Sequence, residues 1–99
     1  MQKLEIMLQS PDAEKMAEEL MQELSPNMQT NLKKLRTRGV DATVIISAVI
    51  TGVSVATNFI TIAEWYKNIR KKQPNVIIKA RYEGKEISLD LESLQKLML

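Results

Sequence analysis

Residues 42–63 read ATVIISAVITGVSVATNFITIA, a run of 22 residues without one charged side chain. A helix of about 20 predominantly apolar residues spans the hydrocarbon core of a bilayer, so this run is long enough to cross one. Asp41 before the run is a suitable helix N-cap, and Pro74 after it stops a helix. The pattern therefore predicts one long apolar helix over residues 42–73.

Small and hydroxyl-bearing side chains recur along this run every three or four residues, which places them on one side of the predicted helix. Small residues let two helix backbones approach closely, and hydroxyl groups can form hydrogen bonds between helices. We therefore predict a helix–helix interface through which the chain forms a homo-oligomer. Its residues are Ser47, Ala48, Thr51, Gly52, Ser54, Ala56 and Asn58.

Three interpretations of the apolar run compete: a membrane helix, the core helix of a soluble scaffold, and a self-associating helix. The membrane helix agrees with aromatic and basic anchors at the membrane interface. These anchors are Trp65, Tyr66, Arg70, Lys71 and Lys72. A constitutive single span would separate the two ends of the chain, and each end is too short to form its own core. We therefore favour the packed or oligomeric helix, with membrane entry as a second state of that helix.

The N-terminal part, residues 1–26, predicts a strand followed by a helix. Apolar and polar residues alternate over residues 3–8, which is typical of a half-buried strand. Ser10 and Pro11 supply an N-cap and a first helical residue, and an apolar stripe of three- and four-residue spacing follows until Pro26. The helix is amphipathic, so we expect one of its faces to be buried.

The C-terminal part, residues 75–99, predicts a hairpin and a short helix. Two alternating stretches meet at Glu83 and Gly84, a turn that contains glycine. Asp90 caps the last helix, whose predicted buried stripe is Leu91, Leu94, Leu97 and Met98. The whole chain, residues 1–99, is thus predicted to be one α+β domain. Its small, mainly antiparallel sheet consists of the N-terminal strand and the hairpin. Its three helices are an amphipathic one near the N-terminus, a long apolar one in the centre and a short one at the C-terminus.

Residues 27–41 form a basic link between these parts. A short helix or a strand over residues 30–36 agrees with the pattern, but we favour a solvated loop. Four cations crowd into six positions of the link: Lys33, Lys34, Arg36 and Arg38. Such a loop is a candidate protease-sensitive segment or a contact for anionic lipid headgroups.

The composition removes most enzyme classes. Without cysteine or histidine, the chain lacks the usual ligands of zinc, haem and iron–sulfur clusters, and also the Ser–His–Asp and Cys–His arrangements. Ser93 and Lys96 match the S-x-x-K string of serine acyl enzymes, but the companion motifs are missing. Only four aromatic residues accompany the cations, and the net charge is +2, so base stacking is poorly supported. We expect neither catalysis, nor a cofactor or metal, nor a nucleic-acid partner.

Several segments carry a family resemblance. The strand that begins Lys3-Leu4-Glu5-Ile6 precedes an acidic helix, the Ala/Val/Ile-rich run closes in EWYKNIRK at residues 64–71, and NVIIKARYEGKEISLD follows at residues 75–90. In these features the chain resembles the effector-associated constant component proteins of bacterial conflict (antiphage) systems. The resemblance implies a small non-enzymatic component that works beside effectors such as proteases and has no active site.

The expected function is accordingly that of an interaction component in a bacterial antiphage defence system. It would associate with itself through the apolar helix, and with an effector or protease as partner. Disruption of the membrane on triggering, for example after proteolysis of the basic link, is an extension of this hypothesis. The expected location is the cytoplasm, with inner-membrane association in the triggered state. The alternatives are a soluble scaffold and a constitutive single-span membrane protein.

Overall fold

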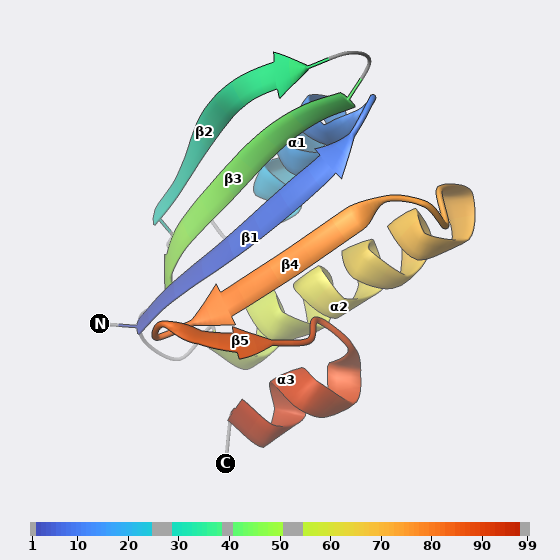
Figure 1. Ribbon diagram of the computed structural model, residues 1–99. Helices are drawn as coiled ribbons and strands as arrows, with labels where there is room; N and C mark the ends of the chain where they lie inside the picture. Colours follow the sequence, from blue (N-terminus) through green and yellow to red (C-terminus); the bar gives the residue numbers. More distant parts are fainter. Residues whose placement is uncertain (1, 25–28, 39–40, 51–54, 98–99) are drawn as a thin grey trace.

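A five-stranded sheet with helices on one of its faces makes up the computed structural model, which describes residues 2–24, 29–38, 41–50 and 55–97 (Figure 1). Helices α1 and α2 lie behind the sheet in Figure 1, and α3 packs against α2. In chain order the elements are β1 (Gln2–Ser10), α1 (Ala13–Glu23), β2 (Gln29–Arg38), β3 (Asp41–Ile50), α2 (Val55–Lys72), β4 (Ile77–Tyr82), β5 (Lys85–Ile87) and α3 (Leu91–Leu97).

The strand order is β2-β3-β1-β4-β5, and every neighbouring pair is antiparallel. The connection through α1 skips over β3, and the connection through α2 skips over β1. This βαββαβ sequence of elements is the ferredoxin-like arrangement, here extended by β5 and α3. The predicted α+β class is confirmed, but the sheet has two strands more than the sequence predicted.

The core lies between the sheet and the helices. On β1 the apolar side chains of Leu4, Ile6 and Leu8 are buried, as the alternation predicted. Helix α1 buries the apolar stripe predicted for it, which includes Met16 and Leu20. The largest side chains of the core come mainly from α2, β1 and β3. Burial of such side chains is the main favourable term in folding.

The prediction of one long apolar helix over residues 42–73 is wrong. The first part of that stretch is strand β3, and α2 begins only at Val55. Asp41 is therefore the first residue of a strand rather than a helix cap. The run is rich in β-branched valine, isoleucine and threonine, which favour strands. Side chains on both faces of β3 are removed from solvent, since residues 42–49 are all buried or half-buried, and this accounts for the lack of charge there.

Within the described residues, no helix combines the length and the hydropathy that crossing a membrane requires. Helix α2 keeps the apolar residues at the end of the run, but its second half is polar and basic and ends in Arg70, Lys71 and Lys72. These cations lie at the negative end of the helix dipole, as predicted. The helix stops at Lys72, two residues before Pro74, as the sequence indicated.

The described part of the basic link is extended rather than a loop. Residues Gln29–Arg38 are strand β2, which pairs with β3, so the favoured loop interpretation is wrong and the strand alternative is right. The four predicted protease-sensitive residues, Lys33, Lys34, Arg36 and Arg38, all belong to this strand. Charged side chains are tolerated there because β2 is an edge of the sheet.

Most of the helix ends and turns predicted from the sequence agree with the structure. Ser10 is an exception: α1 begins after Asp12, and the Ser10 Oγ accepts a hydrogen bond from the Asp12 backbone N–H at 3.1 Å. The hairpin turn is confirmed, with Glu83 and Gly84 at φ angles of 54° and 79°. Positive φ at both central residues is typical of the tight turn that joins two antiparallel strands.

Candidate partner-binding groove

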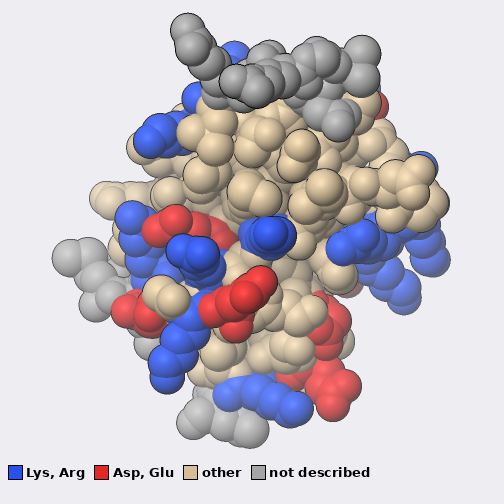
Figure 2. Space-filling model, viewed as in Figure 1, with Lys and Arg blue, Asp and Glu red and all other residues tan. Residues whose placement is uncertain are grey.

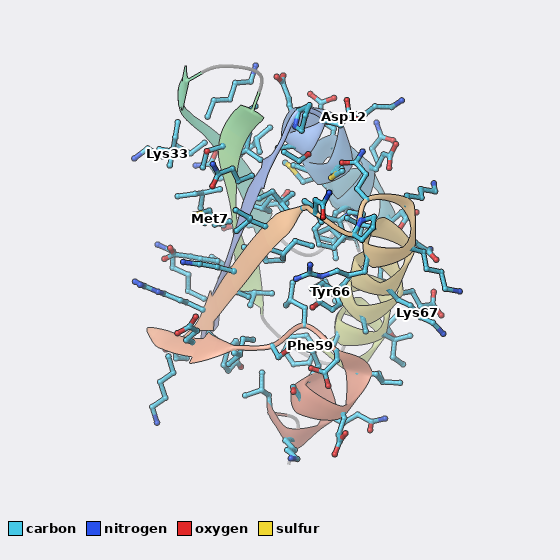
Figure 3. All side chains as sticks on the ribbon, turned by 45° about the vertical axis from the view of Figure 1, so that its right-hand side comes forward. Met7, Asp12, Lys33, Phe59, Tyr66 and Lys67 are labelled. Atoms are coloured by element: carbon cyan, nitrogen blue, oxygen red, sulfur yellow. The ribbon has the colours of Figure 1, made fainter. Side chains whose placement is uncertain are left out.

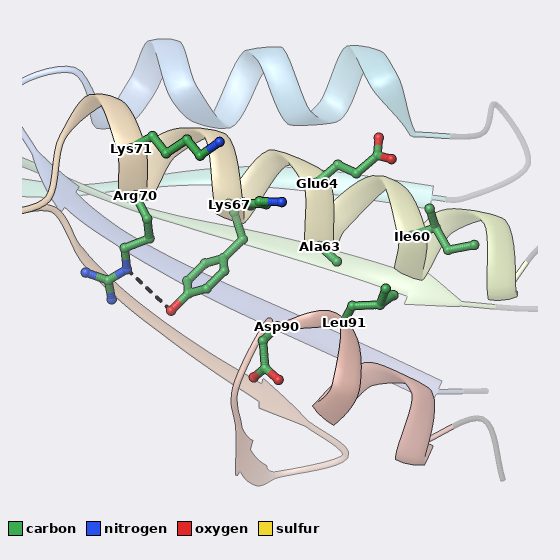
Figure 4. Close-up of a pocket in the computed structure, with 9 residues that line it drawn as sticks. Ile60, Ala63, Glu64, Lys67, Arg70, Lys71, Asp90 and Leu91 are labelled. Atoms are coloured by element: carbon green, nitrogen blue, oxygen red, sulfur yellow. Dashed lines mark hydrogen bonds between the residues drawn. The ribbon is translucent and has the colours of Figure 1, made fainter.

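A groove of about 600 Å³ runs along α2, beside the start of α3 (Figure 4). The buried side of α2 carries Phe59, Ile62, Trp65 and Ile69. The residues of α2 that line the groove lie on the adjacent side of the helix, because most of them recur at three- and four-residue spacing. Helix α2 contributes Ile60, Ala63, Glu64, Tyr66, Lys67, Arg70 and Lys71, and Asp90 and Leu91 come from the start of α3.

Two large apolar side chains are exposed in this groove. Ile60 is 47% exposed and Leu91 is 44% exposed. Besides Ile77 on β4, they are the large hydrophobic residues that the described part of the chain leaves exposed. Scattered apolar residues on a surface need no explanation, but two of them that line one concave site are typical of a binding surface.

Cations line the groove farther along α2, toward the C-terminal end of that helix (Figure 4). Arg70 is held in place: its Nε donates to the Tyr66 hydroxyl at 3.3 Å and its Nη1 donates to the Val76 carbonyl at 3.1 Å. Its guanidinium carbon also lies 5.4 Å from the centre of the Tyr66 ring. Lys67 and Lys71 are exposed and form no ion pair within the described part of the chain. The groove therefore offers two ammonium groups to an incoming anion.

Asp90 also lines the groove, but its carboxylate is already engaged. Its Oδ2 accepts from the Ser93 backbone N–H at 3.1 Å, and its Oδ1 accepts from the Ser93 hydroxyl at 2.8 Å. Hydrogen bonds from the side chains of Ser88 and Ser93 lower the pKa of Asp90 below its ordinary value. The predicted helix cap is thus confirmed, and the lowered pKa keeps Asp90 ionised at neutral pH, with each carboxylate oxygen accepting a hydrogen bond from Ser93.

The predicted helix–helix interface does not lie on one helix. Ser47 and Ala48 belong to β3, where Ala48 points into the core and Ser47 points to the opposite face of the sheet. Ala56 and Asn58 belong to α2, and the side chain of Asn58 is only 2% exposed. The other three, Thr51, Gly52 and Ser54, lie outside the described residues. A three- and four-residue spacing places side chains on one face only within a helix, and part of this run is the extended strand β3.

The predicted membrane anchors have different environments. Trp65 is only 4% exposed, and its Nε1 donates to the Met16 carbonyl at 3.0 Å, so it joins α2 to α1. Tyr66, Arg70 and Lys71 line the groove, and Lys72 is exposed in the last turn of α2. Figure 3 shows Tyr66 between α2 and the sheet, whereas Lys67 points away from the sheet.

Sequence reasoning missed the groove as a site. Ile60 and Lys67 stood in the sequence as parts of the long helix, and Leu91 was assigned to a buried stripe that in fact buries Leu94. No local signal shows that α2 and α3 pack side by side.

Neither a family model nor a curated protein sequence matches the chain. A solved structure with a similar fold is the de novo designed protein Foldit4, which is 14% identical with a TM-score of 0.64. The match covers 85% of this chain and 97% of the design. At this identity the likeness shows the fold alone. A phage SAM lyase in its apo state is also 14% identical, over 88% of this chain and 84% of the lyase, but its TM-score of 0.43 is too low to support an argument.

Proposed function

We propose that this chain is a non-enzymatic interaction component of a bacterial antiphage defence system, and that it binds an acidic amphipathic helix of a partner effector in the α2–α3 groove. The observation that supports the binding role is the pairing of exposed Ile60 and Leu91 with the unpaired cations Lys67 and Lys71 in one groove. The defence role rests on the sequence features shared with the effector-associated constant component proteins.

The dimensions of the groove suit a short helix. From Ile60 to Lys71 the axis of α2 rises about 16 Å, which corresponds to roughly three helical turns. An amphipathic helix binds such a groove through apolar side chains at three- and four-residue spacing. Its acidic side chains would then lie near Lys67 and Lys71, where opposite charge favours the correct orientation and speeds association.

A binding experiment with matched variants tests the groove. The double variant Ile60→Asp and Leu91→Asp should weaken binding to the effector encoded beside this gene by about tenfold or more, because the apolar anchors are lost. Ile77→Asp is the control, since Ile77 is 45% exposed but lies outside the groove. Isothermal titration measures both affinities. Equal loss in the control and the double variant would contradict the groove as the binding site.

A phage challenge tests the defence role separately. Cells that carry the whole gene neighbourhood should resist phage, and deletion of this gene should restore plaque formation. The double variant should also fail to protect at wild-type expression, whereas Ile77→Asp should protect. Plaque counts that do not change on deletion of the gene would refute the defence role, even if the groove binds a partner.

A further inference from the structure

Strand β2 is a long and exposed edge of the sheet. Within the described residues its one strand neighbour is β3, although it extends over Gln29–Arg38. Alternate residues of such an edge direct their backbone N–H and C=O groups toward solvent. The edge is therefore able to accept a further strand, and the side chains of β2 decide which strand.

The two faces of β2 differ in charge. Lys33 lies on the open face of the sheet, opposite Ile45, which is opposite Met7 in the next strand. Figure 3 shows Lys33 and Met7 on the side of the sheet that faces away from the helices. Lys33 is exposed and forms no ion pair within the described part of the chain. Figure 2, viewed onto this open face, shows a broad uncharged area with both basic and acidic side chains along its border.

Lys34 lies on the other face, toward α1. Its Nζ is 2.6 Å from the Glu14 Oε1, and this contact, together with the charge of Glu18, raises the pKa of Lys34. The helix side of the edge is thus neutralised and bordered by acidic residues. An added strand would meet an uncompensated cation on the open face and carboxylates on the helix face.

A second copy of β2 is a poor partner for this edge. The strand reads QTNLKKLRTR, with four cations and no acidic residue. Antiparallel pairing of two such strands sets like charges against each other, which is destabilising. Edge lysines protect many sheets against self-association in this way. The same charges select for a strand of opposite charge.

We propose that β2 accepts an extended acidic segment of a partner protein as a sixth strand. Main-chain hydrogen bonds would supply affinity, and alternate side chains would supply specificity. Acidic side chains of the segment would lie on the open face near Lys33, and neutral side chains would lie over Glu14 and Glu18. The segment is therefore one in which acidic and neutral residues alternate.

The β2 edge and the α2–α3 groove lie at opposite ends of the molecule. Strand β2 is the first strand of the sheet, and α3 follows β5, the last strand (Figure 1). The two surfaces share no residue, so one chain can hold two partners at once. This arrangement would let the protein couple an effector to a second component.

The test uses a fluorescent synthetic peptide of alternating glutamate and valine, and two versions of it with N-methyl groups on either the glutamate or the valine amides. Strand addition predicts saturable binding of the parent peptide. It also predicts that one methylated version loses binding by about tenfold or more while the other retains it, because only one set of amides faces β2. No binding of the parent, or equal behaviour of the two methylated versions, would overturn the proposal.

Variants of the protein test the charge argument. Lys33→Glu should abolish peptide binding, whereas Lys34→Gln should retain it, because the charge of Lys34 is already matched by Glu14. Equal losses in both variants would indicate unspecific charge attraction and contradict the proposal. The groove variant Ile60→Asp with Leu91→Asp should bind the peptide normally, so failure here is distinguishable from failure of the groove. Circular dichroism checks that each variant is folded.

Discussion

The indole N–H of Trp65 donates a hydrogen bond to the backbone carbonyl of Met16 at 3.0 Å, and this bond joins the middle of α2 to α1. Both residues are buried, and both helices pack on the same face of the sheet. The bond matters because it crosses between the two halves of the βαββαβ arrangement. It also explains an aromatic residue that the sequence suggested as a membrane anchor.

Trp65→Phe should lower the free energy of unfolding by about 1–2 kcal/mol, through loss of this hydrogen bond and part of the ring. Trp65→Ala should lower it by about 3–5 kcal/mol, because it leaves a large cavity. Trp65 is the only tryptophan, so unfolding in urea is best followed by circular dichroism rather than fluorescence. Similar stability of the wild type and the alanine variant would show that α2 does not pack on α1 through this residue.

In strand β3, two neighbouring isoleucines should contribute differently to the stability of the fold. Ile46 is buried in the core, whereas Ile45 lies half-buried on the open face. Ile46→Ala should therefore destabilise the protein by about 2–5 kcal/mol, and Ile45→Ala by about 1 kcal/mol or less. Urea unfolding of both variants measures the difference. The reverse order would contradict the register of β3.

Asp90 should contribute to the pH dependence of stability. Its folded-state pKa is lowered by hydrogen bonds from Ser88 and Ser93, so its contribution is present above the ordinary pKa of 3.8 and is lost as the pH falls through the lowered value. Asp90→Ala should cost about 1 kcal/mol at neutral pH, as for other N-caps. Asp90→Asn is the control, because its amide oxygen can still accept the capping bond from the Ser93 backbone N–H but the amide does not titrate.

Urea unfolding at neutral pH and below pH 4 compares the three proteins. The Asp90→Asn variant should lose less stability on acidification than the wild type does. If the two lose the same amount, the carboxylate of Asp90 does not carry the acid-sensitive part of the stability.

Tyr82 should titrate late. Burial raises the pKa of its phenol above the ordinary value of 10.0, with a smaller effect from Glu83. The neutral phenol is favoured in the folded state, so its stabilising contribution is complete below pH 10 and is lost as the pH rises through the raised value. Its ring packs edge-on against Phe59 at 6.0 Å between centroids, and Tyr82→Phe should keep that contact.

Ultraviolet absorbance of the tyrosinate during alkaline titration checks this prediction. The late component should disappear in Tyr82→Phe and persist in Tyr66→Phe, which removes the other tyrosine. If the late component disappears in Tyr66→Phe instead, it belongs to Tyr66, and the prediction for Tyr82 is wrong.

Local signals in the sequence sufficed for much of the fold. Alternation predicted β1, a three- and four-residue stripe predicted α1, and glycine in a tight turn predicted the hairpin of β4 and β5. The Asp90 cap was readable for the same reason: its hydrogen bonds reach only to Ser88 and Ser93 in the same stretch of chain. In each case the deciding interactions lie within a few residues of one another.

Residues 42–63 show where local signals end. Hydroxyl and small residues recur there at helical spacing, yet Thr43, Ile45 and Ser47 alternate with buried Val44, Ile46 and Ala48. The helical period and the two-residue period of a strand are therefore both present in this part of the sequence. The strand wins because β3 is paired on both edges, with β1 on one side and β2 on the other, and those pairings join residues distant in sequence.

The sequence by itself determined the α+β class, the strand and helix at the start, the hairpin and cap at the end, and the absence of cysteine and histidine chemistry. Tertiary structure decided that the uncharged run is a central strand, that the basic link is an edge strand, and that α2 and α3 enclose a groove. The physical reason is that a β-sheet and a helix–helix contact obtain their energy from partners far along the chain. The same residues look alike in sequence whether those partners are present or not.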